Sequence, residues 1–280
     1  PTTTTTVCRF VGTKPLSPGH FRCPAWRALR ASCGVDHALL QSLEAVWGRG
    51  FLSPGGTRDA IRELLGDVST EHAEILDFGC GLGGYSRLFV TELGAKGVVG
   101  VDADRELLAR AERDAASCVP ARPRFLPIVD GRVPLDDASV DLAFAKEVFL
   151  YVPDRAPAFA EIFRMVRPGG SFVLIDLMRR DQEPSDRMRE FMSMEDSFMP
   201  VSIDTLATYR RALAGVGFVE RACWDMTQTY LRHTLREDAL LRAMNADEVE
   251  AMGAEMHRFT CDNWRSTIEV LESGELLIHT

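Results

Sequence analysis

The feature that most constrains the fold is a regular alternation of strand-like and helix-like segments that begins near Val35. Short apolar runs such as EILDFG, GVVGVD, VDLAFA and SFVLIDL predict strands, and amphipathic segments of helical period lie between them. Alternation of this kind is typical of a mostly parallel sheet covered by helices on both faces. We therefore predict an α/β fold.

Two helices are expected before the first strand, in DHALLQSLEAVWG and in RDAIRELLG, and the second should be capped by Thr57 and end at Gly66. After Leu177 the pattern predicts a methionine-rich helix, a further helix, a strand FVERACW, a long helical stretch over about 228–271 and a closing strand ELLIHT. We expect a single domain over 35–280, with helical cap elements at about 35–66 and 184–271.

The first 34 residues have a different composition. They contain a threonine run, scattered proline and glycine, and five basic but no acidic side chains. This composition is typical of a transit-type leader or a cloning remnant, and we expect a leader or disordered extension that takes no part in the fold. A cytoplasmic location is expected, or an organellar one if the segment is a transit peptide.

Charge and cysteine content exclude several classes of function. The net charge is −9, which disfavours binding to nucleic acid phosphates. No apolar run reaches the eighteen residues of a membrane span. The seven cysteines are odd in number and widely spaced, without a C-x-x-C pair or histidines at ligand spacing, so we expect reduced thiols and no metal site. A small-molecule substrate is the best expectation, and the oligomeric state stays open.

A glycine-rich turn, ILDFGCGLGGYSRL, lies where the first strand passes into the following helix. Its glycines satisfy both G-x-G-x-x-G and G-x-G-x-G, the latter through Gly79, Gly81 and Gly83, and neither pattern is specific alone. Asp77 precedes them by two residues, where a carboxylate would repel a dinucleotide pyrophosphate. The acid instead suits a ligand with an ammonium or sulfonium group, such as S-adenosylmethionine.

Two further acids are predicted at successive strand ends. Asp102 ends the second strand, where a carboxylate can accept both ribose hydroxyls, and Asp130 ends the third, close to an adenine amino group. Their neighbours Ala103 and Gly131 are assigned to the cofactor with them. The alternative is that such acids only cap helices.

The segments LDFGCGLGGYSRL, VVGVDAD, VDLAFAKEVFLYVPD and RPGGSFVLID resemble successive motifs of class I S-adenosylmethionine-dependent methyltransferases. The resemblance implies a Rossmann-like, seven-stranded sheet whose last strand, here ELLIHT, is antiparallel. Within this group, WGRGFLSPGG and CDNWRSTIEVLESGELLIHT resemble the phosphoethanolamine N-methyltransferases of the methyltransferase type 11 group. That similarity implies that Leu52 and Ser53 contact the methionine part of the cofactor, and that Lys146 lies over the adenosine or pairs near Glu147.

The residues after the fourth strand are candidates for the chemistry. An amine acceptor arrives protonated, so Glu147 is expected to hold the ammonium and Tyr151 to accept or relay a proton. The resembling family closes its site with a Tyr–His pair, which is not preserved: the histidine position falls at Tyr151 and the tyrosine position near Val35.

The positions that hold phosphate in that family also differ, because they fall at Leu177, Met192, Asp196, Phe198 and Thr267. An acid in place of a guanidinium repels phosphate. We therefore expect an acceptor pocket with Asp196 and Phe198 beside Glu147 and Tyr151, and with further aromatic residues drawn from Phe149, Trp47 and Trp264. Arg179, with Arg180, is a candidate clamp for a substrate carboxylate.

These observations predict N-methylation of a small amine that lacks phosphate. The alternatives are O- or S-methylation of a small carboxylic or thioether acid, and phosphoethanolamine N-methylation. A dinucleotide-dependent oxidoreductase and a non-catalytic cofactor-binding module are the alternatives from other classes.

Overall fold

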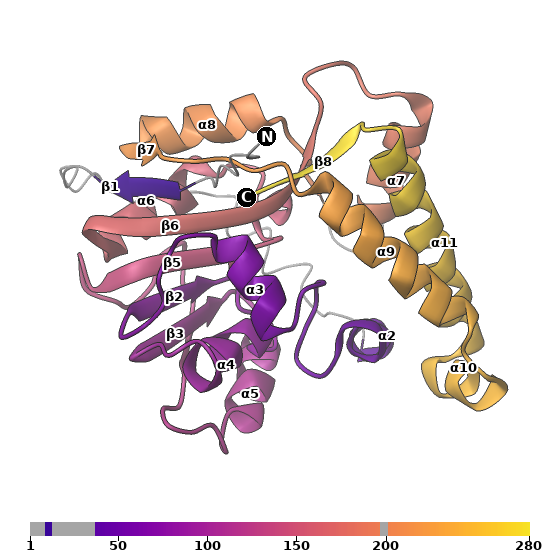
Figure 1. Ribbon diagram of the computed structural model, residues 1–280, viewed down its shortest axis with the longest axis horizontal. Coiled ribbons are helices and arrows are strands. Elements are labelled where there is room, and N and C mark those ends of the chain that lie inside the picture. Colours follow the sequence, from indigo (N-terminus) through magenta and orange to yellow (C-terminus); the bar gives the residue numbers. More distant parts are fainter. Residues whose placement is uncertain (1–8, 13–36, 197–200) are drawn as a thin grey trace, which may run out of the picture.

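An eight-stranded sheet forms the centre of the protein in a computed structural model, which describes residues 9–12, 37–196 and 201–280 (Figure 1). The strand order is β4-β3-β2-β5-β6-β1-β7, and β8 also pairs with β6. The strands are β1 (Arg9–Gly12), β2 (Glu74–Phe78), β3 (Gly97–Asp102), β4 (Arg124–Pro127), β5 (Val140–Lys146), β6 (Val166–Arg179), β7 (Phe218–Glu220) and β8 (Leu276–His279).

Helices cover both faces of the sheet and extend beyond it on one side (Figure 1). They are α2 (His37–Trp47), α3 (Arg58–Leu65), α4 (Gly84–Thr91), α5 (Arg105–Asp114), the short 3-10 helix η1 (Phe149–Tyr151), α6 (Ala156–Met165), α7 (Asp186–Asp196), α8 (Leu206–Gly215), α9 (Thr227–Arg242), α10 (Ala246–Met252) and α11 (Ala254–Glu272).

The direction of the strands agrees with the sequence prediction. The pairs β4–β3, β3–β2, β2–β5 and β5–β6 are parallel, and the closing strand β8 is antiparallel to β6. All seven predicted strands are present. The carboxyl ends of the parallel strands therefore meet at one edge, where ligands bind in open sheets of this kind.

Several boundaries differ from the prediction. The eighth strand, β1, comes from the segment that we excluded: residues 9–12 pair antiparallel with both β6 and β7, whereas the rest of 1–34 lies outside the described residues. The long helical stretch over 228–271 is three helices, because Asn245 begins α10 with a capping box and Gly253, at φ +90°, separates α10 from α11. Helix α6 ends at Met165, just before RPGG, but β6 begins at Val166 and so includes RPGG ahead of the predicted strand SFVLIDL.

Two apolar clusters lie on the two faces of the sheet, and β5 contributes to both by strand alternation. Ala143 and Ala145 face the cluster that includes residues of α6 and α8. Leu142 and Phe144 face the other cluster, which includes residues of α3, α4, α9 and α11. Burial on both faces explains why the central strands are almost uniformly apolar in sequence.

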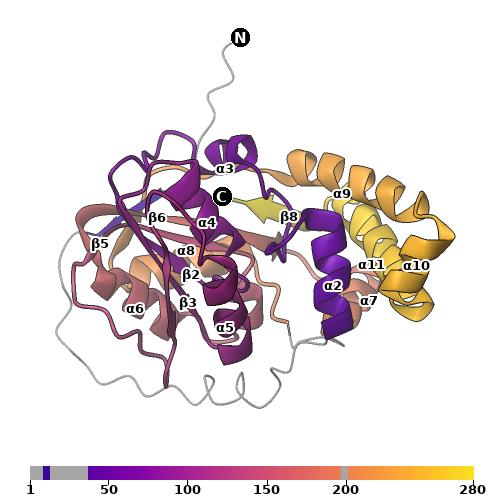
Figure 2. The ribbon, with the colours of Figure 1, turned by 90° about the horizontal axis from the view of Figure 1, so that it is seen from below.

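Helix α2 lies between the sheet and the α9–α11 group (Figure 2). Glu44 of α2 pairs with Arg110 of α5, and Arg49 just beyond α2 pairs with Asp114 at 2.6 Å. At the other side of α2, the ring of Trp47 packs against Trp264 of α11, with centroids 5.3 Å apart. Helix α2 therefore bridges the outer helices and α5, which packs against β3 and β4 of the sheet.

The cysteines depart from the expectation of reduced thiols. Cys80, Cys118 and Cys261 are free, but Cys223 is disulfide-bonded. Among the described residues, no three His, Cys, Asp or Glu side chains gather as a metal site. Within the same residues, none of the helices is both long enough and apolar enough to cross a bilayer.

Candidate functional site

The glycine-rich turn between β2 and α4 is held in a conformation that favours glycine. Gly79, Gly81 and Gly83 have φ values of +75°, +51° and +72°, in the region that L side chains rarely adopt. A Cβ at Gly79 would overlap the side chain of Val148, and one at Gly81 would lie 3.0 Å from Leu52 Cδ1. The turn is thus largely buried and closely covered by neighbouring loops.

Asp77 lies near the end of β2 and is buried, with 2% exposure. Its Oδ2 accepts a hydrogen bond from Ser86 Oγ at 2.5 Å. Burial raises the pKa of Asp77 to about 7, although the Ser86 bond opposes the rise. A cationic group placed beside this carboxylate would offset its desolvation.

Asp102 ends β3 and fixes the glycine turn from the neighbouring strand. Its Oδ2 accepts from the backbone N–H of Gly81 at 2.8 Å, and its Oδ1 accepts from the N–H of Asp104 at 2.9 Å. Burial raises the pKa of Asp102. Each carboxylate oxygen keeps a second lone pair, so the group can still accept hydrogen bonds from a diol.

Asp130 and Gly131 form a two-residue turn rather than a strand end. Their φ values are +50° and +76°, and Val129 and Arg132 close the turn with backbone hydrogen bonds of 2.9 and 3.0 Å. Because β4 ends at Pro127, Asp130 lies three residues beyond the strand, and its side chain is exposed. The prediction that Asp130 ends the third strand was therefore wrong, because a short hairpin with Asp130 at its turn follows the strand. The Asp-Gly pair is a sequence signal for such a turn.

The loop over the glycine turn is anchored by a tyrosine that we had not singled out. Tyr85, in the first turn of α4, is buried, and its hydroxyl donates to the carbonyl of Pro54 at 2.7 Å. The same hydroxyl lies 3.0 Å from Ser53 Oγ. Tyr85 thus anchors the loop that carries Leu52 and Ser53, and Leu52 of this loop lies beside Gly81.

A buried ion pair lies at the end of β5. Lys146, whose side chain is 1% exposed, pairs with Glu147 Oε1. The Lys146 ammonium also lies 5.7 Å from the ring centroid of Tyr85 and 5.2 Å from that of Tyr230. Burial lowers the pKa of Lys146, while the Glu147 carboxylate acts against this. Of the two expectations for Lys146, the pairing with Glu147 is observed.

Glu147 is the first residue after β5 and adopts an unusual backbone. Its φ is +55°, a strained value for a residue with a side chain. Its Oε1 also accepts a hydrogen bond from the Tyr230 hydroxyl at 2.8 Å. The carboxylate is thereby fixed by two donors, one from its own strand end and one from α9.

A cavity of about 170 Å³ opens beside Glu147, between the carboxyl edge of the sheet and helices α2, α9 and α11. Its wall is largely apolar and aromatic, and it includes Trp47 and Trp264. The polar lining residues are Glu147, Tyr151, Tyr230, Thr234, Glu237, Thr260, Asn263 and Thr267. Among the described residues, no lysine, arginine or histidine lines the cavity.

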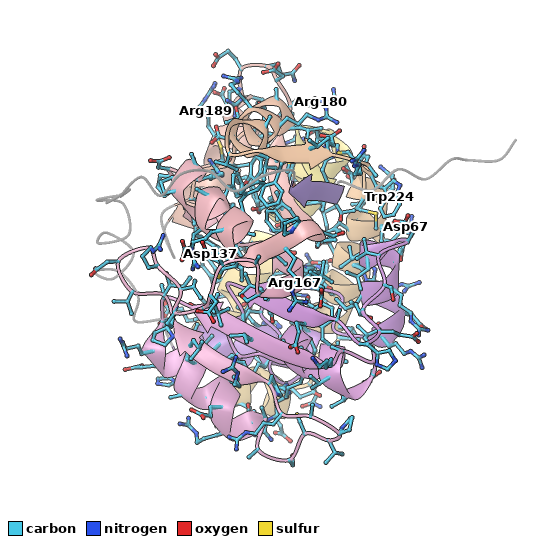
Figure 3. The ribbon with its side chains drawn as sticks, turned by 90° about the vertical axis from the view of Figure 1, so that its left-hand side faces the viewer. Asp67, Asp137, Arg167, Arg180, Arg189 and Trp224 are labelled. Atoms are coloured by element: carbon cyan, nitrogen blue, oxygen red, sulfur yellow. The ribbon has the colours of Figure 1, made fainter. Side chains whose placement is uncertain are left out.

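Two other predicted acceptor residues, Arg179 and Phe149, do not line the cavity. The Arg179 guanidinium donates to the carbonyls of Arg180 and Gln182, and Arg180 lies at the surface (Figure 3), so this pair does not line the cavity. Phe149 is fully buried in the core, 4.6 Å from Phe159 between centroids. Asp196 ends α7, but its side chain, like all of Phe198, lies outside the described part.

Helix α9 contributes site residues that the sequence reasoning missed. Tyr230, Thr234 and Glu237 all line the cavity. They lie at positions i, i+4 and i+7, which share one face of a helix. The spacing of these polar residues in the sequence indicates that they share a helix face. Only the packing of α9 against the edge of the sheet shows that this face borders a cavity.

Comparison with known proteins shows a family match over part of the chain and a fold match over most of it. Residues 76–174 match the family described as "Methyltransferase domain". Phosphoethanolamine N-methyltransferase 1 of Arabidopsis thaliana is 23% identical over 83% of this chain and 46% of its own length. Sarcosine/dimethylglycine N-methyltransferase of Halorhodospira halochloris is 28% identical over 64% of this chain and 66% of that protein.

A solved structure agrees over most of the chain. Phosphoethanolamine N-methyltransferase 2 of Haemonchus contortus, in complex with phosphomonomethylethanolamine and S-adenosylhomocysteine, superposes with a TM-score of 0.76 at 21% identity. The match covers 94% of this chain and 59% of the other. The chain spans about half the length of the phosphoethanolamine N-methyltransferases it matches. The protein therefore has the fold of the S-adenosylmethionine-dependent methyltransferase structures it superposes with, and its residues 76–174 match the methyltransferase-domain family.

Proposed function

We propose that this protein transfers a methyl group from S-adenosylmethionine to the nitrogen of a small amine that lacks phosphate. One observation carries the proposal: the cavity beside Glu147 is lined by carboxylates and aromatic rings and, among the described residues, by no cationic side chain. Such a lining attracts an ammonium and repels phosphate or carboxylate groups.

The residues around the glycine turn fit S-adenosylmethionine. Asp77 offers a buried carboxylate to the ammonium of the methionine part, and Asp102 offers free lone pairs to the ribose. Leu52 and Ser53 would cover the methionine part, while Ala103, Asp130 and Gly131 would border the adenosine. Lys146 would contribute positive charge near the same site, and its ion pair with Glu147 would reduce that charge. The bound cofactor supplies an electrophilic methyl group.

Glu147 and Tyr151 would act on the acceptor. Glu147 is held by Lys146 and Tyr230 and faces the cavity, where it would orient an incoming ammonium. Tyr151 lines the same cavity and would receive or relay the proton that must leave before attack. Holding the nitrogen in line with the methyl group supplies roughly 7–11 kcal/mol of the barrier reduction, and the apolar wall excludes water.

Two other acceptors are less well supported. Phosphoethanolamine is suggested by the relatives' names, but Leu177 and Thr267, two of the positions that align with phosphate ligands, line the cavity as uncharged side chains. O- or S-methylation of an acid needs a cationic clamp, and Arg179 lies away from the cavity.

The proposal is tested by measuring S-adenosylhomocysteine release with amines, phosphoethanolamine and small carboxylic and thioether acids as acceptors. A phosphate-free amine should give the highest kcat/KM. If an acid were the best acceptor, the assignment of the cavity to an ammonium would be wrong.

A further inference from the structure

Glu237 is a buried carboxylate on the cavity wall that the proposed chemistry does not use. It lies on α9 and is 9% exposed. Trp264 Nε1 donates to its Oε2 at 3.0 Å. Within the described part of the chain, no lysine, arginine or histidine forms an ion pair with it, and Lys146 acts on it only through longer-range attraction.

The two carboxylates of the cavity therefore differ. Glu147 is paired with Lys146 and hydrogen-bonded to Tyr230, both through Oε1, so it is the better stabilised of the two and keeps Oε2 for an acceptor. Glu237 is desolvated without a balancing cation, and burial raises its pKa against the opposing effects of the Trp264 and Trp47 side chains. A buried charge without a partner is costly, and a cationic ligand is one way to offset that cost.

The surroundings of Glu237 suit a cation. Trp47 and Trp264 both line the cavity, with ring centroids 5.3 Å apart and planes tilted by 38°. Indole faces attract ammonium, guanidinium and quaternary ammonium groups.

We propose that Glu237, with Trp47 and Trp264, forms a second cation subsite, so that the acceptor is a short molecule with two cationic groups. The inference rests on the proposed function: one nitrogen lies at Glu147 for methylation, and a distal cation lies at Glu237. Tyr230, which contacts Glu147, precedes Glu237 by seven residues of α9, or about 10 Å along the helix axis. This separation favours a short spacer between the two groups.

The first test compares putrescine with n-butylamine, which has the same carbon chain and one amine. The wild-type protein should use putrescine with the lower KM. In Glu237→Gln, the KM for putrescine should rise about 30-fold or more, as for loss of a buried charge partner, while kcat and the KM for n-butylamine stay close to wild type. The amide keeps an oxygen acceptor for Trp264, which limits the effect on folding.

Asp238→Asn is the matched control, because Asp238 is the next residue of α9 and pairs with Arg242 at 2.7 Å outside the cavity. It should leave both KM values unchanged. Equal use of the two amines by wild type, or an unchanged putrescine KM in Glu237→Gln, would overturn the subsite while leaving N-methylation intact.

A binding measurement separates this inference from the proposed function. Calorimetric titration of putrescine into the S-adenosylhomocysteine-loaded protein needs no turnover. Binding by wild type that weakens in Glu237→Gln, but not in Asp238→Asn, supports the subsite even if no methyl transfer is detected. Absence of putrescine binding, or equal binding to all three proteins, would contradict it.

Discussion

Tyr230→Phe tests whether the Glu147 carboxylate must be held by α9. The substitution removes only the hydroxyl that donates to Glu147 Oε1 at 2.8 Å. The ring that lies 5.2 Å from the Lys146 ammonium stays in place. Burial raises the pKa of Tyr230 well above its usual range, so the hydroxyl is protonated and donates throughout the working pH range.

The magnitude follows from the chemistry of the bond. A hydrogen bond to a charged group contributes about 1.5–3 kcal/mol, which corresponds to a factor of about 10–150 in rate if the whole effect acts on the transition state. Glu147 keeps Lys146 as its other partner, so we expect the lower part of this range. We predict that kcat/KM for the best amine falls about 10–30-fold, with S-adenosylhomocysteine affinity unchanged.

Tyr209→Phe provides the control for a purely structural effect. Tyr209 is buried on the opposite face of the sheet, where its hydroxyl donates to Asp176 Oδ2 at 3.1 Å. Its loss should lower the free energy of unfolding and leave kcat/KM of the folded protein unchanged. Methyl transfer by Tyr230→Phe at the wild-type rate, or an equal loss of kcat/KM in Tyr209→Phe, would refute the role given to Tyr230.

Three further changes test other parts of the site. Glu147→Gln should abolish most turnover and retain S-adenosylhomocysteine binding in calorimetry; a normal rate would remove Glu147 from the mechanism. Gly79→Ala should weaken that binding and lower the melting temperature, because the new Cβ overlaps Val148 at a φ of +75°. Burial raises the pKa of Asp77 to about 7, above its value in the unfolded chain, so the folded state binds more protons and stability should fall as pH rises from about 4 to about 7. In Asp77→Asn, denaturant titrations should show a smaller fall of stability over this pH range. Some fall should remain, because the pKa of buried Asp176 is also about 7. A fall equal to that of the wild type would contradict the raised pKa of Asp77.

The sheet could be predicted because its strands are local apolar runs between clear stop signals. The glycine turn and Asp102 followed from the same pattern, since a strand end fixes where its next residue lies. Strand β1 could not be predicted: it has four residues, and its pairing with β6 and β7 joins positions far apart in the chain. Gly253 is a sequence signal for a helix break. The helical periodicity continues on both sides of it, so a single long helical stretch was predicted.

The cavity beside Glu147 was harder to predict than the glycine turn. Glu147 and Tyr151 follow a strand end directly, whereas Tyr230 and Glu237 reach the cavity only because α9 packs across the edge of the sheet. Arg179 also follows a strand end, yet its guanidinium turns to the carbonyls of its own loop. Strand ends thus locate backbone positions, and tertiary packing decides which side chains meet.

The central claim is tested most directly by locating the transferred methyl group. The protein would be incubated with S-adenosylmethionine carrying an isotopically labelled methyl group and with an equimolar mixture of phosphate-free amines, phosphoethanolamine and small carboxylic acids, and the products would be resolved by mass spectrometry. We predict that the label is found on the nitrogen of a phosphate-free amine. Label found mainly on phosphoethanolamine, on an oxygen or sulfur atom, or on no acceptor would contradict the account.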